Sequence, residues 1–193
     1  MKEFLKPSEI IDFDSTLEIM LLSRELANKA QSEVEFVKLA YEFVRDEIAH
    51  SADVGGTVVT CLASEVLREK QGICFAKSHL LAAILRCNGV PTGFCYQRLI
   101  LDDVWFPFLT LHGLNAVFVE NKWIRLDARG NKEGIDAQFS LRRERLAFDI
   151  RPEMGEENFR EIYADPDENV IQALTTHKKI QALWKNLPKE LAT

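Results

Sequence analysis

The stretch QGICFAKSHLLAAILRCNGVPTGF, residues 71–94, decides how the rest of the chain is arranged. It becomes apolar on nearly every side after Cys74 and stops at Asn88-Gly89. A helix that is apolar all round lies at the centre of a protein rather than on its surface. The pattern therefore predicts a central, buried helix over residues 75–87, with Cys74 at its first turn.

The segments before this helix are predicted to form the scaffold around it. Residues 15–30 carry apolar side chains at helical spacing. Residues 32–48 do the same after a capping box, in which Ser32 is the cap and Glu35 stands three residues on. Residues 63–72 are predicted to form a short helix that stops at its terminal glycine.

After residue 90 the apolar period changes from that of a helix to that of a strand. Residues 90–101 are rich in strand formers, and residues 114–128 are predicted to form a hairpin that turns at residues 120–122. A further strand is expected over residues 145–154. The chain then ends in a helix over residues 165–187, for which Asp165 is the expected cap and Pro166 the first helical residue.

Helices, then an antiparallel sheet, then a terminal helix make an α+β fold. The chain has 193 residues, of which 47% are hydrophobic and 28% charged, so we expect a single domain over residues 1–193 with a substantial core. The net charge of −6 comes without a basic patch and argues against nucleic acid or an anionic membrane as the partner. The sequence contains no run of about 18 apolar residues, so it predicts no membrane-spanning helix.

The four cysteines are not arranged as ligands of a metal. They show no C-x-x-C spacing, and no cluster of cysteine and histidine has the spacing of a zinc site. We expect neither a metal nor a cofactor. Without an export signal at the N-terminus, the cysteines are predicted to be reduced thiols in a cytoplasmic protein.

Cys74 differs from the other cysteines because it stands where a helix begins. Unpaired backbone N–H groups and the positive end of the helix dipole favour a thiolate there, and they can also stabilise an oxyanion. The competing interpretation is that Cys74 is a small buried apolar residue, which is the commonest role of a free cysteine.

A nucleophilic cysteine needs a base, and His112 is the best placed of the four histidines. His79 follows Cys74 by five residues on the same helix, so the two side chains diverge. His177 is expected within the last helix and His50 at the end of an earlier one, where each has an ordinary structural explanation.

The predicted hairpin brings a carboxylate to His112. If it turns near residue 121, residues whose numbers sum to about 241 face each other, and this places Asp127 beside His112 on the adjacent strand. A carboxylate there can orient the imidazole and stabilise its charged form. The alternative for Asp127 is that it merely begins the turn DARGNKEG.

These segments together resemble the transglutaminase-like superfamily. Gly72-Ile73-Cys74 followed by the turn Arg86-Cys87-Asn88-Gly89-Val90-Pro91 is similar to the segment that carries the family's nucleophile. The block from His112 through Trp123 to Asp127 is similar to its second conserved block. The resemblance is strongest over residues 35–130 and implies a papain-like α+β fold, in which Cys74 is the nucleophile, His112 the general base and acid, and Asp127 the orienting carboxylate.

The sequence also departs from the family pattern in three places. Gly113-Leu114-Asn115 stands where an aromatic and an acidic residue often follow the histidine, and Ala128-Arg129 stands where Pro-Thr often follows the aspartate. No tryptophan precedes Cys74 to stabilise the oxyanion. Gln71 has suitable chemistry for that role but an unsuitable spacing, and Trp123 could shield the site or simply belong to the core.

The predicted activity is acyl transfer on an amide or peptide carbonyl through a thioester, with a protein or peptide as substrate. The resemblance implies hydrolysis, as in a cysteine protease or amidase, and leaves transamidation open. The alternative is a catalytically inactive protein-binding module that keeps the fold. Residues 131–193 lie outside the resemblance and are expected to shape or cover the cleft.

Overall fold

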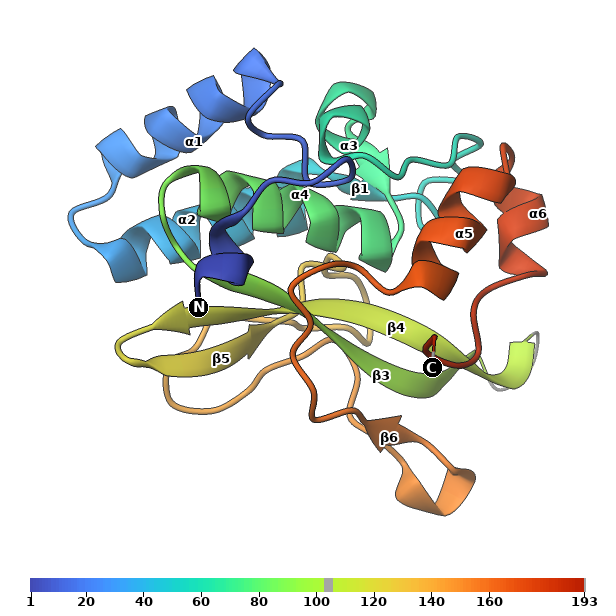
Figure 1. Ribbon diagram of the computed structural model, residues 1–193. Helices are drawn as coiled ribbons and strands as arrows, with labels where there is room; N and C mark the ends of the chain where they lie inside the picture. Colours follow the sequence, from blue (N-terminus) through green and yellow to red (C-terminus); the bar gives the residue numbers. More distant parts are fainter. Residues whose placement is uncertain (103–105, 193) are drawn as a thin grey trace.

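The structure is a computed structural model that describes residues 1–102 and 106–192. One layer consists of helices, and beneath it lies a curled antiparallel sheet (Figure 1). The helical layer contains α1 (Leu17–Lys29), α2 (Glu33–Glu47), α3 (Ala63–Glu69) and α4 (Cys74–Cys87), after a short 3-10 helix, η1 (Lys2–Leu5). This is the α+β architecture that the order of apolar patterns predicts.

The helix α4 is the centre of the molecule, as its sequence predicts. Every residue from Cys74 to Arg86 is buried. Its surroundings explain this, because α4 packs against α1, α2 and α3 on one side and against the strands β3 (Thr92–Asp102) and β4 (Phe106–Val119) on the other. An apolar surface on all sides of one helix is therefore matched by apolar neighbours on all sides.

The main sheet has the strand order β5-β4-β3-β6, where β5 spans Lys122–Leu126 and β6 spans Glu157–Asn158. The β4–β5 hairpin has the predicted register, since Asn115 pairs with Leu126 and Phe118 with Trp123. Glu120 and Asn121 form its turn with φ of 54° and 58°. Positive φ at both turn residues is typical of a two-residue type I′ turn, whose twist matches that of the strands.

A second, two-stranded sheet leads into α4. Its strands β1 (Ala49–His50) and β2 (Gln71–Gly72) run parallel, and His50 pairs with Gly72. The helix before β2 ends earlier than predicted, at Glu69, because Lys70 takes the left-handed conformation with φ of 53°. The pairing with β1 then keeps residues 71 and 72 extended.

Only part of the predicted capping box at the start of α2 forms. Ser32 Oγ accepts a hydrogen bond from Glu35 N at 3.2 Å, as expected. The Glu35 carboxylate, however, accepts from Gln31 N at 2.7 Å, one residue before the cap.

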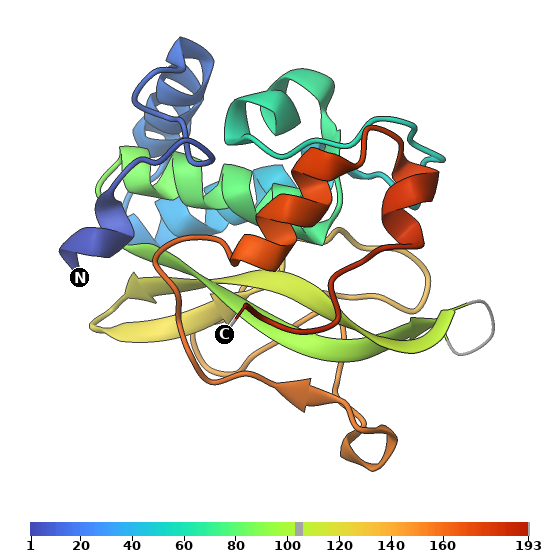
Figure 2. The same ribbon diagram turned by 45° about the vertical axis from the view of Figure 1, so that its right-hand side comes forward.

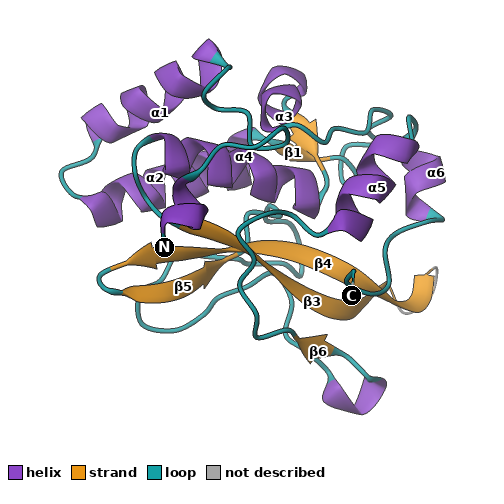
Figure 3. Ribbon diagram, viewed as in Figure 1, coloured by secondary structure: helices purple, strands orange, loops and turns teal. Residues whose placement is uncertain are grey.

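The strand expected over residues 145–154 is wrong. Among the described residues, this segment is loop followed by the 3-10 helix η2 (Pro152–Met154), and the edge strand β6 comes just after it. Pro152 has no N–H to donate to a sheet, and Ala147 N is already used by Asp127 at 3.0 Å. Most of the chain between β5 and residue 167 is loop (Figure 3).

The single C-terminal helix is also a wrong prediction. It is divided into α5 (Glu168–Thr176) and α6 (Ile180–Trp184), and its cap is Asp167, which accepts a hydrogen bond from Asn169 N. The break occurs because Lys179 pairs with Val58 and the next residue's N–H donates to Thr57 O. Figures 1 and 2 both place α5 and α6 at the end of the molecule where α4 begins.

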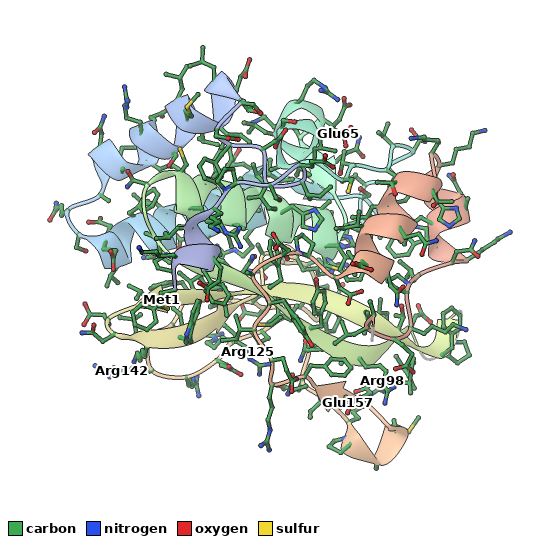
Figure 4. All side chains as sticks on the ribbon, viewed as in Figure 1. Met1, Glu65, Arg98, Arg125, Arg142 and Glu157 are labelled. Carbon is green, nitrogen blue, oxygen red and sulfur yellow. The ribbon has the colours of Figure 1, made fainter. Side chains whose placement is uncertain are left out.

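The outer side of the sheet carries ion pairs instead of a second helical layer. Arg98 Nη2 lies 2.7 Å from Glu157 Oε1, and the two labelled side chains lie together below β3 (Figure 4). Arg125 pairs with Glu144 at 2.5 Å on the same side. These pairs fasten the loops that follow β5 onto the sheet and so fix the loop that reaches Asp127.

Candidate active site

Cys74 is the first residue of α4 and follows β2 by one residue. The cap residue, Ile73, offers no side-chain hydrogen bond, and the first turn contains no acidic residue. The N–H groups of this turn have no partner within the helix, so they remain available to an anion. The side chain of Cys74 is 7% exposed and lines a cavity of about 470 Å³.

His112 and Asp127 lie together as the hairpin register predicts. His112 Nε2 is 2.8 Å from Asp127 Oδ2, and both side chains are at most 1% exposed. A carboxylate only accepts, so Nε2 must be the donor. The structure thus brings together the two side chains that stand 15 residues apart in the sequence.

Asp127 is held by two backbone groups besides His112. Its Oδ1 accepts from Arg129 N at 3.1 Å, and its Oδ2 accepts from Ala147 N at 3.0 Å. Tyr41 Oη donates to the backbone oxygen of the same residue at 3.2 Å. Asp127 is therefore far more than the first residue of a turn, because its whole side chain is buried and hydrogen-bonded.

The surroundings of His112 and Asp127 favour an imidazolium beside a carboxylate. Burial alone lowers the pKa of His112, but the charges of Asp127 and Cys74 and the hydrogen bonds to both raise it above its ordinary value. Burial alone raises the pKa of Asp127, but the charge of His112 and the hydrogen bonds that Asp127 accepts lower it. Since Nε2 faces Asp127, Nδ1 is the ring nitrogen left for the sulfur.

Gly113 explains one departure from the family pattern. A Cβ atom at this position would lie 2.5 Å from Phe75 Cδ1 and 3.4 Å from Phe75 Cα. Only glycine leaves room for the first turn of α4 to approach β4 so closely. The glycine next to His112 therefore helps to bring Cys74 within reach of the imidazole.

Gly113→Ala should separate the two reacting groups. The added methyl group collides with the Phe75 ring, and relief requires the start of α4 to move. We expect a loss of about 10²-fold in acylation by p-nitrophenyl acetate, because misplacement by about 1 Å has effects of this size. The free energy of unfolding in urea should fall by about 1–3 kcal/mol.

Phe75→Val in the same chain provides the control for this substitution. Valine has no δ atom to collide with the added methyl group, so the double variant should recover part of the acylation rate. Wild-type stability and wild-type acylation in Gly113→Ala alone would show that the close approach is unimportant.

Four of the described cavity residues that the sequence did not predict bear on the chemistry of the site. They are His50 from β1, Phe148 from the loop after β5, Trp184 from α6, and Arg129, which follows Asp127 by two residues. The His112 and Phe148 ring centroids are 5.1 Å apart with the planes at 88°, an edge-on contact. The expected contribution of residues 131–193 to the cleft is borne out by Phe148 and Trp184, but no local pattern marks either of them.

Arg129 accounts for the second departure from the family pattern. Its side chain is 7% exposed, and its guanidinium pairs with Asp53, which lies before α3, at 2.5 and 2.9 Å. Its backbone oxygen accepts from the buried Lys77 Nζ at 3.0 Å. The loop after Asp127 is therefore fixed by buried charge pairs and carbonyl contacts.

Two candidates from the sequence lie elsewhere. Trp123 is partly buried and packs against Phe4 and Phe118 with ring centroids 5.0 and 5.5 Å away, on a small apolar cluster that does not line the cavity among the described residues. Gln71 Oε1 points at Gly56, where a Cβ atom would be only 2.4 Å away, and Gln71 is not among the described residues that line the cavity.

The remaining histidines divide into two groups. His79 diverges from Cys74 as predicted, and its Nδ1 lies 2.7 Å from the Cys61 backbone oxygen. His177 is the C-cap of α5, not a residue within a helix. His50 alone of the three shares the cavity with Cys74 in the part of the chain that the structure describes.

Among the described residues, no group of three or more His, Cys, Asp or Glu side chains is arranged to hold a metal ion. No helix within residues 1–102 and 106–192 has the length and apolar character needed to cross a bilayer.

Comparison with solved structures gives matches of low sequence identity. A "putative cysteine protease" from Cytophaga hutchinsonii has a TM-score of 0.53 at 20% identity over 65% of this chain. A "putative protease" from Parabacteroides distasonis has a TM-score of 0.43 at 20% identity over 57%, and a protein named as a TGase has 0.41 at 19% identity over 65%. This chain spans 40%, 23% and 33% of those chains, respectively. The first match shows a shared fold.

Comparison with the curated proteins gives no match. The family model described as Transglutaminase-like superfamily matches residues 21–128, which include Cys74, His112 and Asp127. This range exceeds half of the chain and nearly contains the region in which the sequence resembles that family. The chain belongs to the transglutaminase-like superfamily.

Proposed function

We propose that the protein catalyses thiol-dependent acyl transfer on an amide or peptide carbonyl, with Cys74 as nucleophile. One observation carries the proposal. His112 lies between the carboxylate of Asp127, 2.8 Å away, and the sulfur of Cys74, at a cavity large enough for part of a peptide. Nucleophile, base and orienting group are the three parts that such chemistry requires.

The first step forms a thioester. The Cys74 thiolate attacks the carbonyl carbon, a C–S bond forms, and the carbonyl electron pair moves onto oxygen. When the tetrahedral intermediate collapses, the C–N bond breaks and the leaving amine takes a proton from the His112 imidazolium. Asp127 keeps the ring oriented and stabilises its charged form throughout.

The second step determines whether the enzyme is a hydrolase or a transamidase. Neutral His112 accepts a proton from the acceptor as it attacks the thioester, and Cys74 leaves as thiolate. We propose water as the acceptor, because the cavity is also lined by the exposed side chains of Lys132 and Glu133 and so opens to solvent. The name of the Cytophaga hutchinsonii protein, a "putative cysteine protease", agrees with hydrolysis.

Incubation with a tryptic digest of casein and with dansylcadaverine tests the proposal. We expect mass spectrometry to find new peptide termini with the wild type and none with Cys74→Ala. Dansyl fluorescence should not enter the peptides, and its incorporation would instead indicate transamidation. If the wild type yields neither new peptide termini nor dansyl incorporation, the result would favour the inactive binding module.

A further inference from the structure

The reaction needs a second group to stabilise the oxyanion. One donor is available at the start of α4, where the N–H of Cys74 has no partner within the helix. Oxyanion sites generally combine at least two donors aimed at the position where the charge develops. Gln71 is excluded, since it is not among the described residues that line the cavity.

The parallel pairing of β1 with β2 places His50 close to the start of α4. The parallel register sets His50 opposite Gly72, two residues before Cys74, and Ser51 N donates to Gly72 O at 3.2 Å. His50 lines the same cavity as Cys74 and His112. The pairing of β1 with β2 thus brings a ring N–H donor to the entrance of α4.

The imidazole of His50 has an unused hydrogen-bonding atom. The residue is 7% exposed, and its Nδ1 is buried without a hydrogen-bond partner. His79 is buried as well, at 1% exposed, but its Nδ1 lies 2.7 Å from the Cys61 backbone oxygen. An unpartnered buried polar atom is costly, and it stays in place most readily where a ligand supplies the partner.

The surroundings of His50 suit a neutral donor. Burial and then the positive charge of Arg129 hold the pKa of His50 well below its ordinary value, so the ring carries no proton charge near neutral pH. The ring also packs against Trp184, with centroids 6.4 Å apart and planes at 35°. A neutral, packed ring donates a hydrogen bond without competing with His112 for the role of acid.

We propose that His50 is the side-chain donor of the oxyanion hole, acting with the backbone N–H of Cys74. This inference rests on the proposed function and adds a catalytic residue to it. As Cys74 attacks, the carbonyl electron pair moves onto oxygen, and the oxyanion accepts from both N–H groups. When the C–N bond breaks, the pair returns to form the thioester carbonyl and both donors are released.

Two reagents separate this role from that of the thiolate. Acylation of Cys74 by p-nitrophenyl acetate passes through a tetrahedral oxyanion, whereas alkylation by iodoacetamide displaces iodide and forms none. His50→Phe keeps a ring against Trp184 but removes the donor. We expect its acylation rate to fall by about 10²–10³-fold with the alkylation rate unchanged.

His50→Gln restores a donor and should recover much of the acylation rate, while His177→Gln, outside the cavity, should match the wild type in both reactions. Melting temperatures check that each variant is folded. If His50→Phe is unfolded, His50→Leu, which also lacks a donor, takes its place and should show the same selective loss of acylation. Wild-type acylation by folded His50→Phe would overturn the proposal, as would equal losses in both reactions. A wild type inert to both reagents would instead mean that the proposed function itself fails.

Discussion

Cys74→Ala should reduce acyl transfer by at least about 10⁴-fold, because Cys74 is the one cysteine among the described residues that lines the cavity with His112. The side chain that is removed is the one at the start of α4 that lines the cavity with His112. The measurement is intact mass after incubation with p-nitrophenyl acetate, together with the release of p-nitrophenol. The wild type should gain one acetyl group and the variant none.

Cys87→Ala is the matched control for this experiment. Cys87 is the last residue of the same helix and does not line the cavity, as far as the described residues show. Its replacement should leave acylation unchanged. An acetyl group on Cys87, or normal turnover by Cys74→Ala, would assign the activity to a different group.

Asp127→Asn should reduce turnover by about 10⁴-fold while leaving a folded protein. The carboxylate accepts from His112 Nε2 and from two backbone N–H groups. An amide in its place must turn its NH₂ toward one of these donors, and it stabilises neither the imidazolium nor the correct tautomer. The comparison is with Asp14→Asn, which changes an exposed carboxylate.

The same variant should change how stability depends on pH. The pKa of Asp127 is lowered in the folded state, so this residue contributes stability above its unfolded value of about 3.9, and the contribution is lost as the pH falls. The pKa of His112 is raised, so its contribution is complete below about 6.5 and is lost as the pH rises. Asp127→Asn should therefore lower the melting temperature more between about pH 4 and about pH 6.5 than at lower or higher pH. A uniform decrease at every pH would contradict the charge pairing.

The sequence predicts the parts of the fold whose patterns are local and strong. The apolar run after Cys74 has no polar face, so the helix that it forms must be surrounded by other elements and lie at the centre of the fold. The hairpin has a defined turn at Glu120 and Asn121, and its period of two residues then fixes which side chains face each other. His112 and Asp127 could be brought together on this basis alone.

Other features depend on contacts between distant segments. Lys179 leaves the helical conformation because it pairs with Val58, and no residue near it in the sequence predicts the break between α5 and α6. His50 reaches the cavity only through the pairing of β1 with β2, and Trp184 only through the separate helix α6. From the sequence, Trp123 could either shield the site or belong to the core, whereas no pattern in the sequence pointed to Trp184.

Alkylation by iodoacetamide as a function of pH tests most directly whether His112 and Cys74 form a charged pair. An ordinary free thiol should lose on the order of 200-fold in rate between about pH 9 and about pH 6, as its thiolate is protonated. We expect the rate of Cys74 in the wild type to fall less than about tenfold over this range, and His112→Gln to behave as an ordinary thiol. An equally steep loss in both proteins would show that His112 and Cys74 do not form a charged pair.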